Sequence, residues 1–160
     1  MLYLGIDPGG SGGLALISDR GRFVDFEAMP ESRAALLVKL LEFKERAGDG
    51  GLRVLLEQVT PQPKRPGVAG WSAKGTASFF RNVGHIEMAL TASRLPFEEL
   101  RGPAWQKVVE LVYPKGEPRN KNRSKARVAE IFPTLENVTH AAADALLIAE
   151  ACRRLHRGER

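Results

Sequence analysis

Three acidic residues lie inside segments that are otherwise apolar. Asp7 ends an apolar run at the N-terminus, Glu57 interrupts the segment RVLLEQV, and Asp144 lies within AAADALLI. A buried carboxylate is costly in free energy unless it is paired or bound to a cation. One such residue alone would be explained as a cap, a turn residue or a partly exposed acid. Three of them in one chain call for a shared explanation.

A cluster of carboxylates suggests hydrolysis of phosphodiester bonds with divalent metal ions. The negative charges repel one another unless cations neutralise them, and hard oxygen ligands suit Mg²⁺ or Mn²⁺. In such a site two ions, roughly 3.5–4 Å apart, stabilise the attacking and the leaving oxygen. Residue periodicity does not show that Asp7, Glu57 and Asp144 meet in space. Their convergence depends on the fold.

Hydrophobic periodicity predicts one α/β domain over residues 1–160, with a five-stranded mixed sheet flanked by helices. The first three strands are joined by tight turns, which predicts an antiparallel meander. The strands are expected at 2–7, 14–17, 22–28, 53–59 and 95–100, and the helices at 31–46, 76–92, 103–112, 122–132 and 139–155.

The positive charge of the chain is concentrated in two segments. The net charge is +5 and the isoelectric point is near 9.7, so a polyanionic partner is worth considering. Residues 58–81 contain no acidic residue, and residues 101–127 contain eight Lys or Arg against Glu110 and Glu117. Both segments are therefore candidates for contact with phosphates.

Composition also bears on location. No run of about 18 apolar residues occurs, so we expect no membrane-spanning helix. Residues 1–10 are typical of a first strand and not of a signal peptide. The single cysteine, Cys152, is compatible with a reducing compartment. We expect a protein of the cytoplasm, in a bacterium or a phage-infected cell.

Three segments together resemble the RuvC family of Holliday junction resolvases. They are the opening LGIDPGGSGG, the strand LLEQV and the terminal HAAADALLIAEA, and the resemblance runs from residue 2 to about 151. Lys74-Gly75 before a helix, and the helix with Trp105 ahead of a basic segment, resemble the phage-encoded members. The resemblance implies an RNase H-like fold of the retroviral integrase superfamily. It also implies a homodimeric endonuclease of DNA recombination and repair, which makes symmetric nicks in branched DNA.

The resemblance also implies roles for the acids. Asp7 would bridge two Mg²⁺ ions, for which Mn²⁺ could substitute, while Glu57 and Asp144 would each bind one. The family usually has a fourth group, three residues before the last Asp, but that position here is Ala141. His140, four residues before Asp144, lies on the same helical face and is the candidate catalytic residue and metal ligand in its place. The alternative is a helix-start residue without a metal role.

Contacts to DNA are expected from both basic segments. Trp71 would stack on an unpaired base at the branch point, or else cover the sheet as a local lid. Ser124 and the basic residues would contact the DNA backbone, unless they form a solvated surface. Phe79, Phe80, Ile86 and Met88 would form the dimer surface or the core. The complete set of predicted DNA-binding residues is Lys64, Arg65, Trp71, Lys74, Arg81, Lys115, Arg119, Lys121 and Lys125.

The sequence leaves two other functions open and disfavours a third. An RNase H-like nuclease acting on RNA or an RNA–DNA hybrid would use the same carboxylates. A catalytically silent module that binds branched DNA is a second alternative, which the Ala141 departure leaves open. A phosphotransferase of the actin and sugar-kinase type needs two such domains around its nucleotide, and 160 residues supply only one. We expect no small-molecule cofactor.

Overall fold

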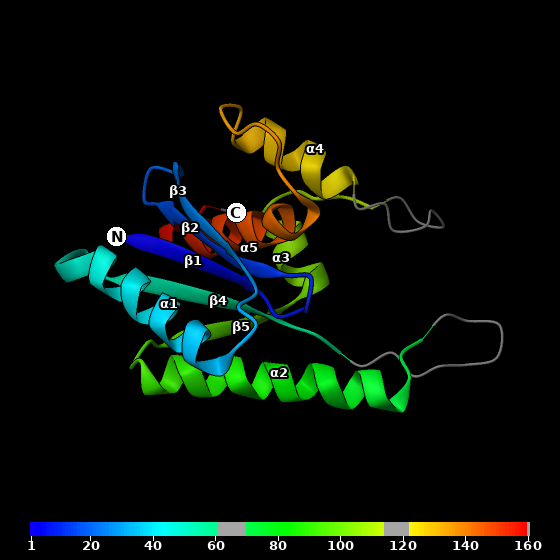
Figure 1. The fold of residues 1–160 in the computed structure, drawn as a ribbon. Helices are drawn as coiled ribbons and strands as arrows, with labels where there is room; N and C mark the ends of the chain where they lie inside the picture. The colour runs from blue at the N-terminus through cyan, green and yellow to red at the C-terminus, as the bar shows by residue number, and fades with distance from the viewer. Residues whose placement is uncertain (61–69, 114–121, 160) are drawn as a thin grey trace.

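Strand β1 (Leu2–Asp7) lies at the centre of a five-stranded mixed sheet with the order β3-β2-β1-β4-β5. This computed structural model describes residues 1–60, 70–113 and 122–159 (Figure 1). β1 pairs antiparallel with β2 (Gly13–Ser18), which pairs antiparallel with β3 (Phe23–Ala28). On its other side β1 pairs parallel with β4 (Leu52–Gln58), which pairs parallel with β5 (Phe97–Arg101). The predicted meander and mixed sheet are confirmed.

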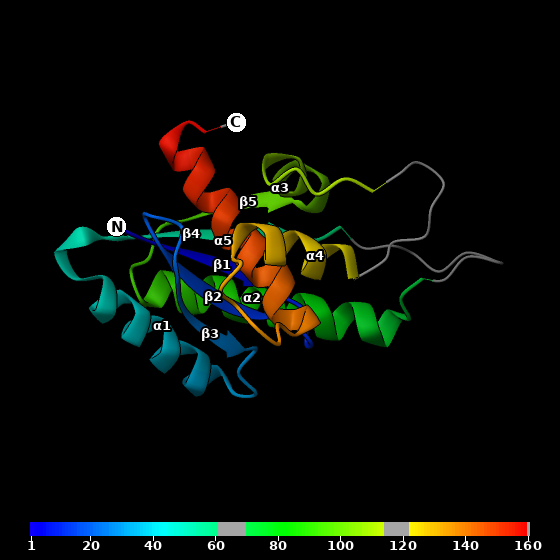
Figure 2. The same ribbon diagram turned by 90° about the horizontal axis from the view of Figure 1, so that it is seen from above.

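Helices cover both faces of this sheet (Figure 1 and Figure 2). On one face lie α1 (Arg33–Ala47) and α2 (Ala73–Ala92), which pack on the even-numbered residues of β1, Leu4 and Ile6. On the other face lie α3 (Gly102–Val108), α4 (Asn122–Ile131) and α5 (His140–Arg157). This arrangement follows from strand geometry, because alternate side chains point to opposite faces and each apolar face requires cover.

Helix α5 crosses β1 in direct backbone contact at Gly5. A Cβ atom at this position would lie 2.2 Å from the amide nitrogen of Ala149 and 2.3 Å from the carbonyl oxygen of Ala145. No other residue type fits there without moving the helix. Ala142, Ala143, Ala145, Ala149 and Ala151 are all buried, so the small residues of α5 serve this close approach.

The predicted bounds differ from the observed ones where local capping decides the end. α2 begins at Ala73 and not at Thr76, because the Ser72 hydroxyl accepts the amide hydrogen of Gly75 at 3.0 Å. β5 begins at Phe97 and not at Leu95, since Arg94 takes a positive φ of 52°. α3 ends at Val108, four residues early, and Glu110 follows with a φ of 56°. No described helix is long and apolar enough to cross a membrane.

Candidate metal and nucleic-acid site

Asp7 and Glu57 lie side by side at the carboxyl ends of two parallel strands. Ile6 is the register partner of Leu56, so the next residue of each strand is one of the two acids. Ile6 and Leu56 are buried against α1 and α2, and alternation directs Asp7 and Glu57 to the opposite face, under α5. Both acids are partly buried. The structure thus brings together two of the three predicted acids.

The glycine-rich turn after β1 fixes the Asp7 carboxylate. Its Oδ1 atom accepts the amide hydrogen of Gly9 at 3.1 Å. A Cβ atom at Gly12 would lie 2.2 Å from the Asp7 carbonyl oxygen and 2.8 Å from the Asp7 carboxyl carbon. From α2, Asn82 donates its side-chain amide to the Pro8 carbonyl oxygen at 2.9 Å. The glycines therefore allow the chain to fold closely over the acid, and α2 holds the turn in place.

The Glu57 side chain is held by a residue of α3, the helix that follows the neighbouring strand β5. The indole Nε1 of Trp105 donates a hydrogen bond to Glu57 Oε1 at 3.1 Å. Trp105 is only 1% exposed, so this contact lies at the border between the apolar core and the candidate site.

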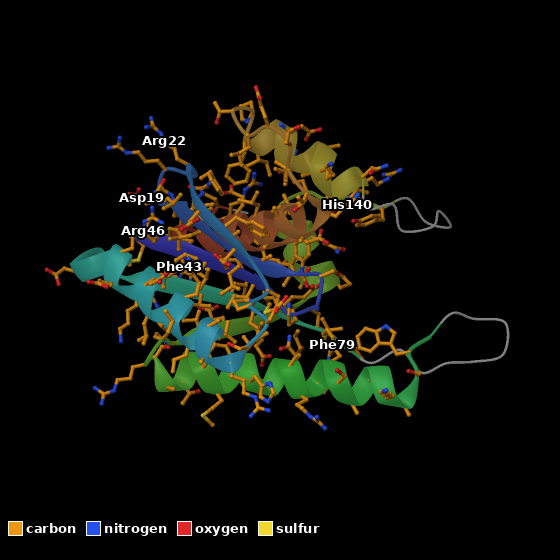
Figure 3. All side chains as sticks on the ribbon, in the orientation of Figure 1. Asp19, Arg22, Phe43, Arg46, Phe79 and His140 are labelled. Carbon is orange, nitrogen blue, oxygen red and sulfur yellow. The ribbon has the colours of Figure 1, made fainter. Side chains whose placement is uncertain are left out.

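Asp144 belongs to the first half of α5, and His140 is the first residue of that helix. Thr139 caps the helix, its hydroxyl accepting the amide hydrogen of Ala142 at 3.2 Å. Asp144 is partly buried beside Ala145, the residue whose carbonyl faces Gly5 of β1. His140 is exposed one turn earlier, and Figure 3 shows it at the end of the molecule where α5 begins.

The donor set suits a hard divalent cation, but the three carboxylates are not gathered into a closed cluster. Across residues 1–60, 70–113 and 122–159, no group of three or more His, Cys, Asp or Glu side chains could hold a metal ion as placed. Asp7 and Glu57 form the neighbouring pair, and Asp144 comes from the helix above them. The ligand roles of these residues and of His140 therefore stay predictions.

The first basic segment leads into α2. Lys74 and Arg81 are exposed on the first half of this helix. Trp71 is partly buried and packs on Phe79, with ring centroids 4.8 Å apart and ring planes inclined by 53°. Phe79 in turn packs edge-on against Phe80 at 5.4 Å. The predicted contacts Lys64 and Arg65 lie outside the described residues.

The second basic segment ends at α4. Lys125 is partly exposed there, while Lys115, Arg119 and Lys121 lie outside the described residues. The predicted contact of Ser124 with the DNA backbone is wrong, because its side chain is buried and its Oγ lies 3.4 Å from the Tyr113 hydroxyl. Its helix position faces the core and not the solvent.

A pocket of about 550 Å³ lies between the glycine turn, the β3–α1 connection and α2. Its polar lining includes Glu31, Arg81, Asn82 and His85. Loss of water contact and the positive charges of Arg33 and Arg81 lower the pKa of His85. The sequence reasoning missed Asn82 and His85. The sequence pattern that could have indicated His85 is its spacing of four residues from Arg81, which places both on one helical face.

Only some of the side chains predicted for the dimer surface or the core on α2 are exposed. Ile86 is fully buried in the core, so the part of the prediction that places it on the dimer surface is wrong. Phe80 is 36% exposed and Met88 is 66% exposed. Ile86 faces α1 and the sheet because it falls on the inner stripe of the helix.

Comparison with solved structures supports the predicted fold. The RuvC structure from Thermus thermophilus in complex with a Holliday junction substrate superposes with a TM-score of 0.71 and 16% identity, over 99% of this chain and 97% of that one. A second structure of Thermus thermophilus RuvC gives 0.70 and 18%, over 99% and 98%. Comparison of the sequence with protein-family models and with curated proteins gives no match. The chain thus has the RuvC-type, RNase H-like fold.

Proposed function

We propose that this chain is a divalent-metal-dependent endonuclease that nicks branched DNA, as a Holliday junction resolvase does. The observation that carries the proposal is the carboxylate pair Asp7 and Glu57, adjacent on parallel strands under the helix that bears Asp144. This pair lies in a fold shared with RuvC, one structure of which is bound to a Holliday junction substrate.

Asp7, Glu57 and Asp144 would hold Mg²⁺, with Mn²⁺ as a possible substitute. The bound ions supply the activation of water and the stabilisation of charge on the phosphodiester. The chain itself fixes the carboxylates before any ion binds, through the Gly9 amide on Asp7 and the Trp105 indole on Glu57. His140 is exposed one turn from Asp144, so its imidazole would accept or hold the proton of the attacking water.

DNA would approach over the end of the sheet where the parallel strands finish. Lys74 and Arg81 on α2, and Lys125 on α4, would neutralise phosphates there. The Trp71–Phe79 pair offers an aromatic surface for a base that is unpaired at the branch point.

A second copy of the chain would complete the reaction. A four-way junction has two equivalent strands to cut, and a two-fold dimer places two identical sites on them. The exposed Phe80 and Met88 on α2 are the side chains offered to that contact. The enzyme would act in the cytoplasm, where Cys152 stays reduced.

A panel of nucleic acids tests the proposal. With Mg²⁺, we expect symmetric nicks in a four-way junction, and much slower cutting of linear duplex DNA. Asp7→Asn should abolish nicking while junction binding persists. Preferred cutting of an RNA–DNA hybrid or structured RNA would instead indicate an RNase. Junction binding without any nicking, in Mg²⁺ and in Mn²⁺, would indicate a silent binding module.

A further inference from the structure

We infer that Trp105 is a positioning residue for the metal-binding carboxylate of Glu57. The inference rests on the proposed function and deepens it. It concerns a residue of the core that does not touch the substrate or the metal, but sets the orientation of a side chain that does. The observation behind it is the hydrogen bond of 3.1 Å between Trp105 Nε1 and Glu57 Oε1.

The course of the chain from β5 into α3 brings the Trp105 N–H to the Glu57 carboxylate. β5 runs parallel to β4, and its Leu100 is the register partner of Glu57. One residue later β5 ends at Arg101, and α3 begins at Gly102. The first turn of α3 then places Trp105 at the level of the strand end. On the exposed side, Arg101 also donates to Gln58 at 3.2 Å, which ties the same two strand ends together.

The indole ring of Trp105 has little freedom to turn. Its side chain is 1% exposed. It belongs to the core cluster that also contains Leu55 of β4, Leu146 of α5, and Val109 at the end of α3. The end of α3 is closed by two backbone hydrogen bonds, from Val109 to Trp105 at 3.2 Å and from Leu111 to Gln106 at 2.8 Å. A donor held this firmly imposes its direction on the acceptor.

The acceptor of this hydrogen bond distinguishes it from the bonds that usually satisfy a buried tryptophan N–H. A tryptophan N–H can only donate, and a buried one normally finds an acceptor. Here the acceptor is a carboxylate, so the bond is charge-assisted and stronger than one to a neutral carbonyl. Partners that orient a metal ligand from behind typically change metal affinity or activity by about 10- to 100-fold when removed. We therefore expect Trp105 to influence metal binding more than its packing alone would.

The test measures Mn²⁺ affinity by titration calorimetry on the full-length protein without DNA. Trp105→Phe removes the N–H and should weaken Mn²⁺ binding by about 10-fold. Phe132→Leu is the matched control, because Phe132 is 3% exposed in the same core cluster. It should lower the melting temperature similarly and leave Mn²⁺ affinity unchanged. Equal affinity in Trp105→Phe and wild type would overturn the inference.

A second variant covers the case in which Trp105→Phe does not fold. In a Trp71→Phe background, Trp105 is the remaining tryptophan of the two in the chain. Its replacement by β-(3-benzothienyl)alanine keeps the ring size and removes only the N–H. Weaker Mn²⁺ binding than in the Trp71→Phe protein supports the inference, and unchanged binding overturns it. Failure of the proposed function looks different, since wild type and Asp7→Asn would then bind Mn²⁺ equally poorly.

Discussion

The two halves of α5 each carry an acid, and the protein treats them in opposite ways. Glu150, in the second half, has a side chain only 3% exposed and is enclosed by arginines. Arg153 donates to it at 2.8 and 2.9 Å, and Arg154 at 2.8 Å. This ion pairing raises the pKa of Arg153 far above its usual value. The chain supplies the cations that this carboxylate needs.

Asp144, in the first half, lies among alanines. No Lys, Arg or His of the described residues lies within ion-pair distance of its carboxylate. It is partly buried and adjacent in sequence to Ala145, whose carbonyl oxygen faces Gly5 of β1. Glu150 is thus neutralised within the fold, whereas for Asp144 we propose that a metal cation supplies the neutralising charge.

The largest expected effect comes from Asp144→Asn. The substitution keeps the shape of the side chain and removes the charge that we propose binds a metal ion. We expect junction nicking in Mg²⁺ to fall by about 10³-fold, which corresponds to about 4 kcal/mol of barrier. The melting temperature should change little, because Asp144 forms no ion pair with the residues that the structure describes. Gel assays of nicking and a thermal melt check the two expectations. Nicking near the wild-type rate would contradict the role assigned to Asp144.

Glu150→Gln should have the opposite signature. It leaves Arg153 and Arg154 facing each other in a largely buried position, 13% and 19% exposed as side chains. We expect a loss of about 3 kcal/mol in the free energy of unfolding, measured by urea denaturation. Glu159→Gln is the control, since that exposed partner of Arg153 should contribute much less to the stability. A stable Glu150→Gln protein with impaired nicking would reverse the comparison.

His140→Ala tests whether the first half of α5 contributes a fourth group. A general base or a residue that orients the reacting water contributes about 10²- to 10⁴-fold, so we expect a rate loss of at least 10²-fold. Gel assays of junction nicking in Mg²⁺ measure this loss against wild type. Retention of more than half of the wild-type rate would exclude the role.

Smaller effects are expected at the phosphate contacts. Lys74→Ala and Arg81→Ala should each weaken junction binding and lower the slope of log affinity against log salt by about 1. Arg22→Ala is the matched control, because Arg22 is an exposed cation in the β2–β3 turn, well away from His140 in Figure 3. Equal salt slopes in all three variants would show that the DNA does not pass over α2.

The smallest effect concerns Cys152, which lies in the second half of α5. Burial raises the pKa of its thiol from 9.0 to about 12. The unfolded chain therefore releases this proton before the folded chain does. The stability that the thiol contributes is complete below pH 9.0 and declines as the pH rises from there toward 12. The native protein should resist thiol reagents at pH 8. Rapid labelling of Cys152 would contradict this and show that the second half of α5 opens to solvent.

The sequence was sufficient to predict most of the fold. Short apolar runs bounded by turn residues marked the strands, a period of 3.6 marked the α-helices, and the glycine turn after Asp7 marked the end of β1. The errors fell at element ends, as at Glu110, where a positive φ ends α3 before its apolar pattern does. Backbone conformations of this kind depend on tertiary contacts and have no clear signature in a sequence.

The candidate site was predicted less completely. The acids stood out because an apolar segment makes a charge conspicuous. Residues that act through geometry did not, such as Asn82, which reaches the Pro8 carbonyl across 74 positions of sequence. Ser124 was misplaced, and Ile86 was left between the core and the dimer surface, because a helix pattern does not tell which stripe faces the core when several are mixed. Only the packing of α4 and α2 decides that.

The most direct test of the metal site is a crystal structure of the protein soaked in Mn²⁺, with anomalous scattering recorded at the manganese edge. We expect an anomalous peak between the carboxylates of Asp7, Glu57 and Asp144, and its loss in Asp7→Asn. Manganese bound elsewhere, with this position empty in the wild-type crystal, would contradict the central claim.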